Sequence, residues 1–190
     1  MTGKKFDPKK LRKLNDPQRL LDIPPDHVCG KLSQQNPDVL IEIGTGTAFF
    51  SLAFHQQLKA SITYACDLSD TMIHWIEENI TPNYPYITPV KSEESSVPLS
   101  DGIADLVFMI NLHHELEDQS LVMQEALRLL KPEGEVFIID WKKEDMPQGP
   151  PVEIRCFPEQ VELQLEKAGF VDIRSFDEMP KHFLVIGKKQ

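Results

Sequence analysis

The stretch VLIEIGTGTA at residues 39–48 decides the fold of this chain. Its first half is a short apolar run, which predicts a buried strand over Val39–Ile43. Gly44 and Gly46 follow at once and predict a tight turn into a helix over residues 47–58, because glycine adopts backbone conformations that strain other residues. A strand, a glycine turn and a helix in this order are typical of a nucleotide site, where amides at the helix start favour an anionic group. A purely structural turn from strand to helix has the same pattern.

Apolar strands and helices alternate along the rest of the chain. Further strands are predicted at residues 61–66, 86–90, 104–110, 135–140, 170–176 and 183–187. Helical spacing of apolar residues predicts helices at residues 69–80, capped by Ser69, and at 116–130 and 158–168, with a turn at 131–134. The last two strands are short neighbours, which favours antiparallel pairing. We therefore expect an α/β fold: a Rossmann-like, doubly wound sheet of seven strands, mostly parallel with an antiparallel final strand, and helices on both faces.

The first 37 residues differ in composition from the rest. They are polar, carry five prolines, and predict two short helices, at residues 17–21 and 26–32. We divide the chain into an N-terminal helical arm or lid, residues 1–37, and a main domain, residues 38–190, and expect the buried core to begin at Val39. Residues 1–20 hold seven Lys and Arg residues against two Asp residues. Such an arm binds nucleic acid or an anionic substrate, or it folds back onto acidic surface.

The composition excludes several classes of protein. With 41% hydrophobic and 26% charged residues, the chain has the profile of an ordinary globular protein. Its net charge of -10 argues against a nucleic-acid partner, which needs a basic surface. No apolar run approaches the ~18 residues of a membrane span, and the charged start is not a secretory signal. The three cysteines are far apart in the sequence, so we expect no disulfide scaffold, no metal site and a cytoplasmic location.

A second ligand-binding residue is expected where the strand 61–66 ends. Asp67 follows that strand and lies 23 residues after Gly44. Its carboxylate suits the two hydroxyls of a ribose, although a surface acid near the start of the next helix has the same position. NAD and S-adenosylmethionine both contain such a ribose. Phe49 replaces the third glycine of a dinucleotide turn, and Glu42 would repel a pyrophosphate but not a cationic sulfonium, so we favour S-adenosylmethionine.

Six segments of the sequence follow known motif patterns and support this choice. Residues 39–48 follow the pattern V-L-D-x-G-x-G-x-G, residues 67–72 follow D-x-S-x-x-M, and residues 92–99 follow G-D-A-x-x-L-P-F. Residues 111–114 follow the step xLHH, residues 130–134 follow L-K-P-G-G, and residues 168–170 are A-G-F. In this order the segments resemble the class I S-adenosylmethionine-dependent methyltransferases, especially the small-molecule type related to ubiquinone and menaquinone methyltransferases. The resemblance runs from Val39 to the C-terminus and implies methyl transfer to a small-molecule acceptor.

The resemblance also implies which residues hold the cofactor, S-adenosylmethionine. They are Glu42, Gly44, Thr45, Gly46 and Asn111 at the methionine part, Asp67 at the ribose, Glu93 and the amide of Glu94 at the adenine, and Leu68 and Met72 beside them. Three positions depart from the family pattern. Glu42 and Glu93 stand where the family has aspartates, and Ala48 replaces the third glycine of the turn. A glutamate keeps the acceptor oxygens but is one methylene longer.

His114 and Asn111 are the candidate catalytic residues, because they follow the strand 104–110 beside the expected methyl group. Methyl transfer is an in-line displacement, so much of its rate comes from alignment of nucleophile and methyl. An acceptor that must lose a proton also needs a general base. His114 is such a base or a substrate-orienting residue, or it packs at a helix start. The run His113–Glu115 is a poor metal site, because adjacent side chains diverge.

Two residues after the strand 135–140 leave further alternatives open. Trp141 either forms a wall for a flat substrate or covers the core, and Arg155 either binds an anionic substrate or lies on the surface. Two other functions also stay open at this point: an NAD-binding oxidoreductase, and a non-catalytic module that binds S-adenosylmethionine. The acids Glu42, Asp67 and Glu93 argue against a decayed site, though not against a sensor.

Overall fold

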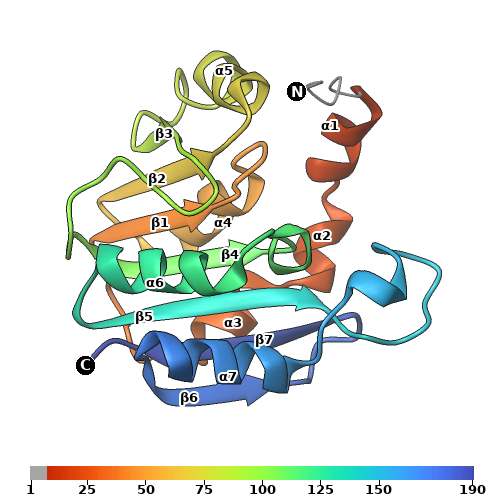
Figure 1. Cartoon of the computed structure of the whole chain (residues 1–190). Helices are drawn as coiled ribbons and strands as arrows, with labels where there is room; N and C mark the ends of the chain where they lie inside the picture. The colour runs from red at the N-terminus through yellow and green to blue at the C-terminus, as the bar shows by residue number, and fades with distance from the viewer. Residues whose placement is uncertain (1–7) are drawn as a thin grey trace.

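The protein folds around one seven-stranded sheet, seen in a computed structural model that describes residues 8–190 (Figure 1). The strands are β1 Val39–Ile43, β2 Ile62–Asp67, β3 Ile87–Lys91, β4 Ala104–Ile110, β5 Leu130–Trp141, β6 Val171–Phe176 and β7 His182–Lys188. Their order in the sheet is β3-β2-β1-β4-β5-β7-β6, and β7 runs antiparallel to both of its neighbours. The expected sheet is therefore confirmed. The order reverses between β1 and β4, and ligands of such sheets bind at the carboxyl edge beside this point.

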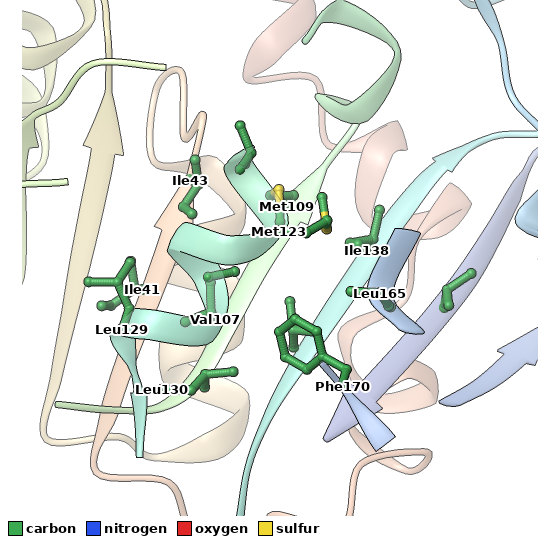
Figure 2. Close-up of a cluster of buried hydrophobic side chains, with 14 of the residues drawn as sticks. Ile41, Ile43, Val107, Met109, Met123, Leu129, Leu130, Ile138, Leu165 and Phe170 are labelled. Carbon is green, nitrogen blue, oxygen red and sulfur yellow. The ribbon is translucent and has the colours of Figure 1, made fainter. Parts of the chain in front are cut away.

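Helices cover both faces of the sheet, as expected. They are α1 Pro8–Leu14, α2 Gln18–Asp22, α3 Pro25–Cys29, α4 Phe49–Leu58, α5 Asp70–Asn79, α6 Gln119–Leu129 and α7 Pro158–Ala168, with single turns η1 His113–Glu115 and η2 Val152–Ile154. Alternate residues of each strand point to opposite faces. Val107, Met109 and Ile138 pack against α6 and α7, whereas Leu40 and Phe108 face the side of α4. Figure 2 shows the first of these two cores.

The N-terminal segment belongs partly to the core. Ile23, Val28 and Leu32 have exposed fractions of 1%, 0% and 4%, and they lie in the cluster formed by β1, β4 and α4. The expectation that burial begins at Val39 is therefore wrong. In Figure 1, α1 and α2 lie beyond the arrowheads of β1 and β4, at the carboxyl edge of the sheet.

Several boundaries differ from the sequence prediction for identifiable reasons. The helix expected from residue 116 begins at Gln119, because the side chain of Asp118 accepts the amide of Leu121 and caps it there. Residues 131–134 are not a separate turn but a bulge within β5, where the pairing shifts from Ala104↔Leu130 to Leu106↔Glu135. Asp67 is the last residue of β2 rather than the first after it, and Ser69 precedes α5 without a capping hydrogen bond from its side chain.

Candidate active site

The glycine turn after β1 brings the backbone close to two other parts of the chain. Gly44 and Gly46 have φ angles of +74° and +59°, in the region that favours glycine. A Cβ atom on Gly44 would lie 2.6 Å from the side chain of Leu112, which follows β4. A Cβ atom on Gly46 would lie 3.4 Å from Leu14 of α1. Other segments therefore pack closely against the backbone of this turn, and α1 lies directly over it.

Glu42 places a carboxyl group inside this turn. Its exposed fraction is 2%, and Oε2 accepts hydrogen bonds from Thr45, at 2.8 Å, and from Ser51 of α4. Burial raises the pKa of Glu42 to about 7, although these hydroxyls and the charge of Arg19 oppose the shift. The nearby Ser51 was not found from the sequence, because only the fold brings α4 over the end of β1.

Asp67 holds the same turn from β2. Its Oδ2 accepts the amide of Gly46 at 2.8 Å and its Oδ1 accepts the amide of Ser69 at 2.8 Å. Burial raises the pKa of Asp67, while these two hydrogen bonds and Lys91 act in the opposite direction. A carboxylate offers about four acceptor positions, so two remain for hydroxyl groups of a ligand. The position therefore suits a ribose.

The other residues expected at the cofactor lie along the same edge. Leu68, next to Asp67 in the chain, is 58% exposed, whereas Met72 of α5 is buried. Glu93 and Glu94 follow β3, which is tied to β2 by the amide of Ser92, a donor to the carbonyl of Asp67 at 3.0 Å. Glu93 is exposed, and Glu94 is fixed by accepting the amide of Glu117 at 3.0 Å. The sheet edge therefore brings the segments after β1, β2 and β3 together.

A histidine–aspartate pair joins the ends of β4 and β5. His114 Nδ1 lies 2.8 Å from Oδ1 of Asp140, whose carboxylate also accepts the amides of His114 and Trp141 at 3.0 Å and 2.7 Å. Burial is the largest effect and lowers the pKa of His114, but the hydrogen bond and the charge of Asp140, together with the charge of Glu115, outweigh it and raise the pKa overall. Asp140 was missed from the sequence. Like Asp67, Asp140 is an acid at the carboxyl end of a buried apolar strand. The sequence pattern that predicted a role for Asp67 was therefore also present at Asp140.

Two buried oxygen atoms at this edge have no hydrogen-bond partner within residues 8–190. They are Oδ1 of Asn111, a residue held at φ +56° after β4, and Oγ1 of Thr47 in the glycine turn. Buried acceptors without partners are costly, so such atoms commonly meet a ligand or an ordered water. An ammonium group beside Glu42 would suit this set of oxygens. The residues present therefore fit the amino acid end of S-adenosylmethionine as well as its ribose.

Two sequence alternatives are resolved by packing. Arg155 is 4% exposed, and its guanidinium donates to the carbonyls of Lys142, Glu144, Gln148 and Pro150. It organises the loop after β5, so both the substrate-binding and the surface interpretations are wrong. Trp141 packs against the ring of His182 at 4.3 Å and closely against Gly149, and so covers the core.

The part of the chain that the structure describes lacks two other kinds of site. No helix among these residues combines the length and apolar character needed to cross a membrane. Nor do three or more metal-ligating side chains gather anywhere between residues 8 and 190.

Comparisons with known proteins agree with this geometry. Residues 41–138, about half of the chain, match the family described as "Methyltransferase domain". A solved S-adenosylmethionine-dependent methyltransferase from Aquifex aeolicus is 31% identical, with a TM-score of 0.86 over 98% of this chain and 100% of that one. A putative type 11 methyltransferase from Sulfolobus solfataricus, 24% identical, has a TM-score of 0.69 over 93% and 94% of the two chains.

A curated relative adds a different substrate class. The human tRNA N(3)-cytidine methyltransferase METTL2B is 28% identical over 113 residues, which are 55% of this chain and 29% of that protein. The chain thus matches less than a third of the length of this relative.

Fold, site and relatives together define a class I S-adenosylmethionine-dependent methyltransferase. The chain belongs to the methyltransferase domain family, and the cofactor of this family is S-adenosylmethionine rather than NAD.

Proposed function

We propose that this protein transfers the methyl group of S-adenosylmethionine to a small-molecule acceptor. The observation that carries the proposal is the glycine turn held between the buried carboxyl groups of Glu42 and Asp67. It lies at the same sheet edge as the His114–Asp140 pair, which joins the ends of β4 and β5. One end of this arrangement suits cofactor binding and the other suits proton transfer.

The cofactor residues have distinct roles in this proposal. Asp67 receives the ribose hydroxyls, and Glu42 with Asn111 receives the ammonium group. The turn from Gly44 through Thr45 to Gly46 lets the methionine part approach the backbone, while Leu68 and Met72 lie beside the adenine, whose edge meets Glu93 and Glu94. The cofactor supplies a methyl group made electrophilic by its sulfonium. Of the lid expected over residues 1–37, the part proposed here is the helix α1, Pro8–Leu14, which lies over this edge, excludes water and holds the acceptor in line; residues 1–7 lie outside the described residues.

His114 is the proposed general base. Nδ1–H of His114 donates a hydrogen bond to Oδ1 of Asp140, which fixes the ring and leaves Nε2 to accept a proton from the acceptor molecule. The raised pKa of His114 makes it a stronger base near neutral pH. Asn111, beside it at the end of β4, orients the acceptor. General bases of this kind contribute about 10²- to 10⁴-fold in rate.

The charge distribution supports a small acceptor over RNA. The chain carries a net charge of -10, and seven of its 20 Lys and Arg residues lie in the first 20 positions, which leaves the rest of the chain strongly acidic. An acidic surface repels the phosphate backbone. The motif pattern favours the ubiquinone and menaquinone branch of the family. The second candidate is tRNA methylation, which the similarity to METTL2B favours, with the basic arm as the contact to RNA.

Radiolabelled methyl transfer tests these alternatives directly. The purified protein is first titrated with S-adenosylhomocysteine by calorimetry, and then incubated with labelled S-adenosylmethionine and either a panel of small acceptors or unmodified tRNA. We expect binding, and label in a small molecule. Label in tRNA alone would establish the second candidate. Binding without transfer to any acceptor would favour a non-catalytic module, and absence of binding would refute the assignment of the site.

A further inference from the structure

His182, the first residue of β7, is a buried histidine without a hydrogen-bond partner. Its exposed fraction is 1%, and neither Nδ1 nor Nε2 meets a donor or an acceptor within residues 8–190. Two other buried histidines have partners: His55 lies 2.9 Å from the hydroxyl of Thr63, and His113 lies 2.6 Å from Oε1 of Gln164. An unpaired buried polar group costs free energy, so the ring of His182 points to a ligand that would offset this cost.

The place of His182 in the sheet separates it from the cofactor residues. Those residues follow β3, β2, β1 and β4, the first four strands in the order β3-β2-β1-β4-β5-β7-β6. His182 begins an antiparallel strand and pairs in register with Trp141 at the carboxyl end of β5. It therefore lies at the same edge of the sheet, beyond β4. The other unpartnered buried side-chain atoms among residues 8–190, in Thr47 and Asn111, lie at this edge too and are accounted for by the cofactor.

The surroundings of the His182 ring are apolar. Because alternate residues of a strand share a face, the ring lies on the same face of the sheet as Leu184. Leu184 belongs to the apolar cluster that also holds Ile23 and Met179. The ring of Trp141 lies against the imidazole, with 4.3 Å between the two centroids. A ligand group that reaches His182 thus enters an apolar environment.

The charges near the ring balance one another. Four charged side chains act on it: Asp140 of β5, Asp22 and Arg19 of α2, and Lys181. Each already has a partner, since Asp140 holds His114, Asp22 pairs with Lys181 at 2.8 Å, and Arg19 lies over the ring of Phe50. Burial lowers the pKa of His182 to about 4, so the imidazole is neutral at neutral pH.

We propose that His182 binds the methyl acceptor through an uncharged group that both donates and accepts hydrogen bonds, such as a hydroxyl. A neutral imidazole has one N–H donor and one nitrogen acceptor, and a hydroxyl pairs with either. A carboxylate only accepts, an ammonium only donates, and each would bring an unpaired charge into this apolar place. The inference rests on the proposed function and adds a specificity, for uncharged, hydroxyl-bearing acceptors. Since the ring is 1% exposed, the acceptor reaches it when Trp141 or α2 shifts.

Three probes that share a benzene ring test which group His182 binds: phenol, benzoate and benzylammonium. Each is added at the same concentration, near neutral pH, to nitrogen-15-labelled protein saturated with S-adenosylhomocysteine. Long-range proton–nitrogen NMR reads the histidine rings, and the signals of His182 are those that His182→Leu lacks. We expect phenol to shift the ring nitrogens of His182, because a hydrogen bond forms there, and the two charged probes to leave them unchanged.

The same variant separates ligand binding from a structural role. His182→Leu removes an unpaired polar group, so we expect Tm of the ligand-free protein to rise by on the order of 2–4 °C. With a small acceptor identified by labelled methyl transfer, KM should rise by on the order of 10-fold while kcat stays within about threefold. His74→Gln, at an exposed histidine of α5, is the matched control and should change none of these quantities.

The outcomes distinguish this inference from the proposed function. A protein that binds S-adenosylhomocysteine but whose His182 signals ignore phenol, or respond equally to all three probes, overturns the role of His182 alone. A lower Tm of His182→Leu, or an unchanged KM, does the same, because the ring would then serve the fold. If S-adenosylhomocysteine does not bind the wild type, the proposed function itself falls.

Discussion

Glu42 has an ionisable side chain, although it is buried away from water. Its carboxyl has two hydroxyl donors on one oxygen and a guanidinium nearby, and burial still raises its pKa to about 7. The unfolded chain ionises this group near pH 4.5, so between these values the folded state holds a proton that the unfolded state has lost. The stability that this group contributes is therefore present below about pH 4.5 and is lost as pH rises toward about pH 7.

Glu42→Gln removes this dependence. We expect the wild-type free energy of unfolding to fall by on the order of 2–3 kcal/mol more than that of the variant across this pH window. Urea unfolding followed by circular dichroism at half-unit steps of pH measures the difference. Glu166→Gln, at an exposed position of α7, is the control and should titrate like the wild type. Parallel pH profiles for wild type and Glu42→Gln would contradict the prediction.

Asp67 links the turn to the proposed ribose site, so its loss should affect both. Asp67→Ala removes the acceptor of the Gly46 amide and of the proposed ribose hydroxyls. We expect affinity for S-adenosylhomocysteine to fall by about 1.5–3 kcal/mol, because charged hydrogen bonds are lost. Calorimetry measures it, with Asp70→Ala, three residues away and exposed, as the control. Unchanged affinity in a folded Asp67→Ala protein would place the ribose elsewhere.

At the scale of elements, the pair His114–Asp140 fastens the loop after β4 to the end of β5. One carboxylate receives the ring of His114 and two backbone amides, and its side chain is 2% exposed. Neighbouring parallel strands would otherwise have only their ladder hydrogen bonds to align their ends. The proposed catalytic role and this structural role therefore involve the same atoms.

Asp140→Asn tests the two roles together. The amide keeps the shape but loses the charge, so we expect a loss of about 1–3 kcal/mol in unfolding free energy. Methyl transfer should fall by on the order of 10²-fold while affinity for S-adenosylhomocysteine stays within about twofold. Asp145→Asn, an exposed acid on the following loop, is the control. Equal losses in transfer and affinity would mean that the pair only shapes the cofactor site.

The elements differ in how well the sequence predicts them. Val39–Ile43 and Ala104–Ile110 are found with correct bounds, because uninterrupted apolar runs between polar turns carry the signal locally. The helix Pro8–Leu14 is missed, because this short lysine-rich stretch has only two apolar residues at helical spacing, Leu11 and Leu14, which is a weak signal. The acids Glu42 and Asp67 were predicted as cofactor residues from their place at the ends of two apolar strands, and these roles stay predictions. The partners Arg19, Ser51 and Asp140 depend on contacts between distant segments, which no local pattern records.

On the scale of the whole molecule, the boundary at residue 38 does not separate two independent parts. Residues 23–32 fill one core with Ile23, Val28 and Leu32, while α1 reaches the glycine turn through Leu14. Burial of three such side chains contributes about 1.5–3 kcal/mol each, in a domain whose total stability is about 5–15 kcal/mol. Within the described residues, the N-terminal segment is thus part of the fold from α2 onward, and α1 is the part proposed as a cover.

Two truncations separate these contributions. A protein of residues 17–190 lacks α1 but keeps the three core residues and Arg19, so we expect cooperative unfolding within about 1 kcal/mol of the full chain. It should retain binding of S-adenosylhomocysteine yet lose most methyl transfer, because water then reaches the glycine turn that Leu14 covers.

A protein of residues 36–190 should fail to unfold cooperatively, since its core is left open. Thermal unfolding and labelled methyl transfer to an identified acceptor measure both. Transfer at the full-length rate by residues 17–190 would show that α1 is not a lid, and a stable 36–190 protein would show that the core closes without the N-terminal segment.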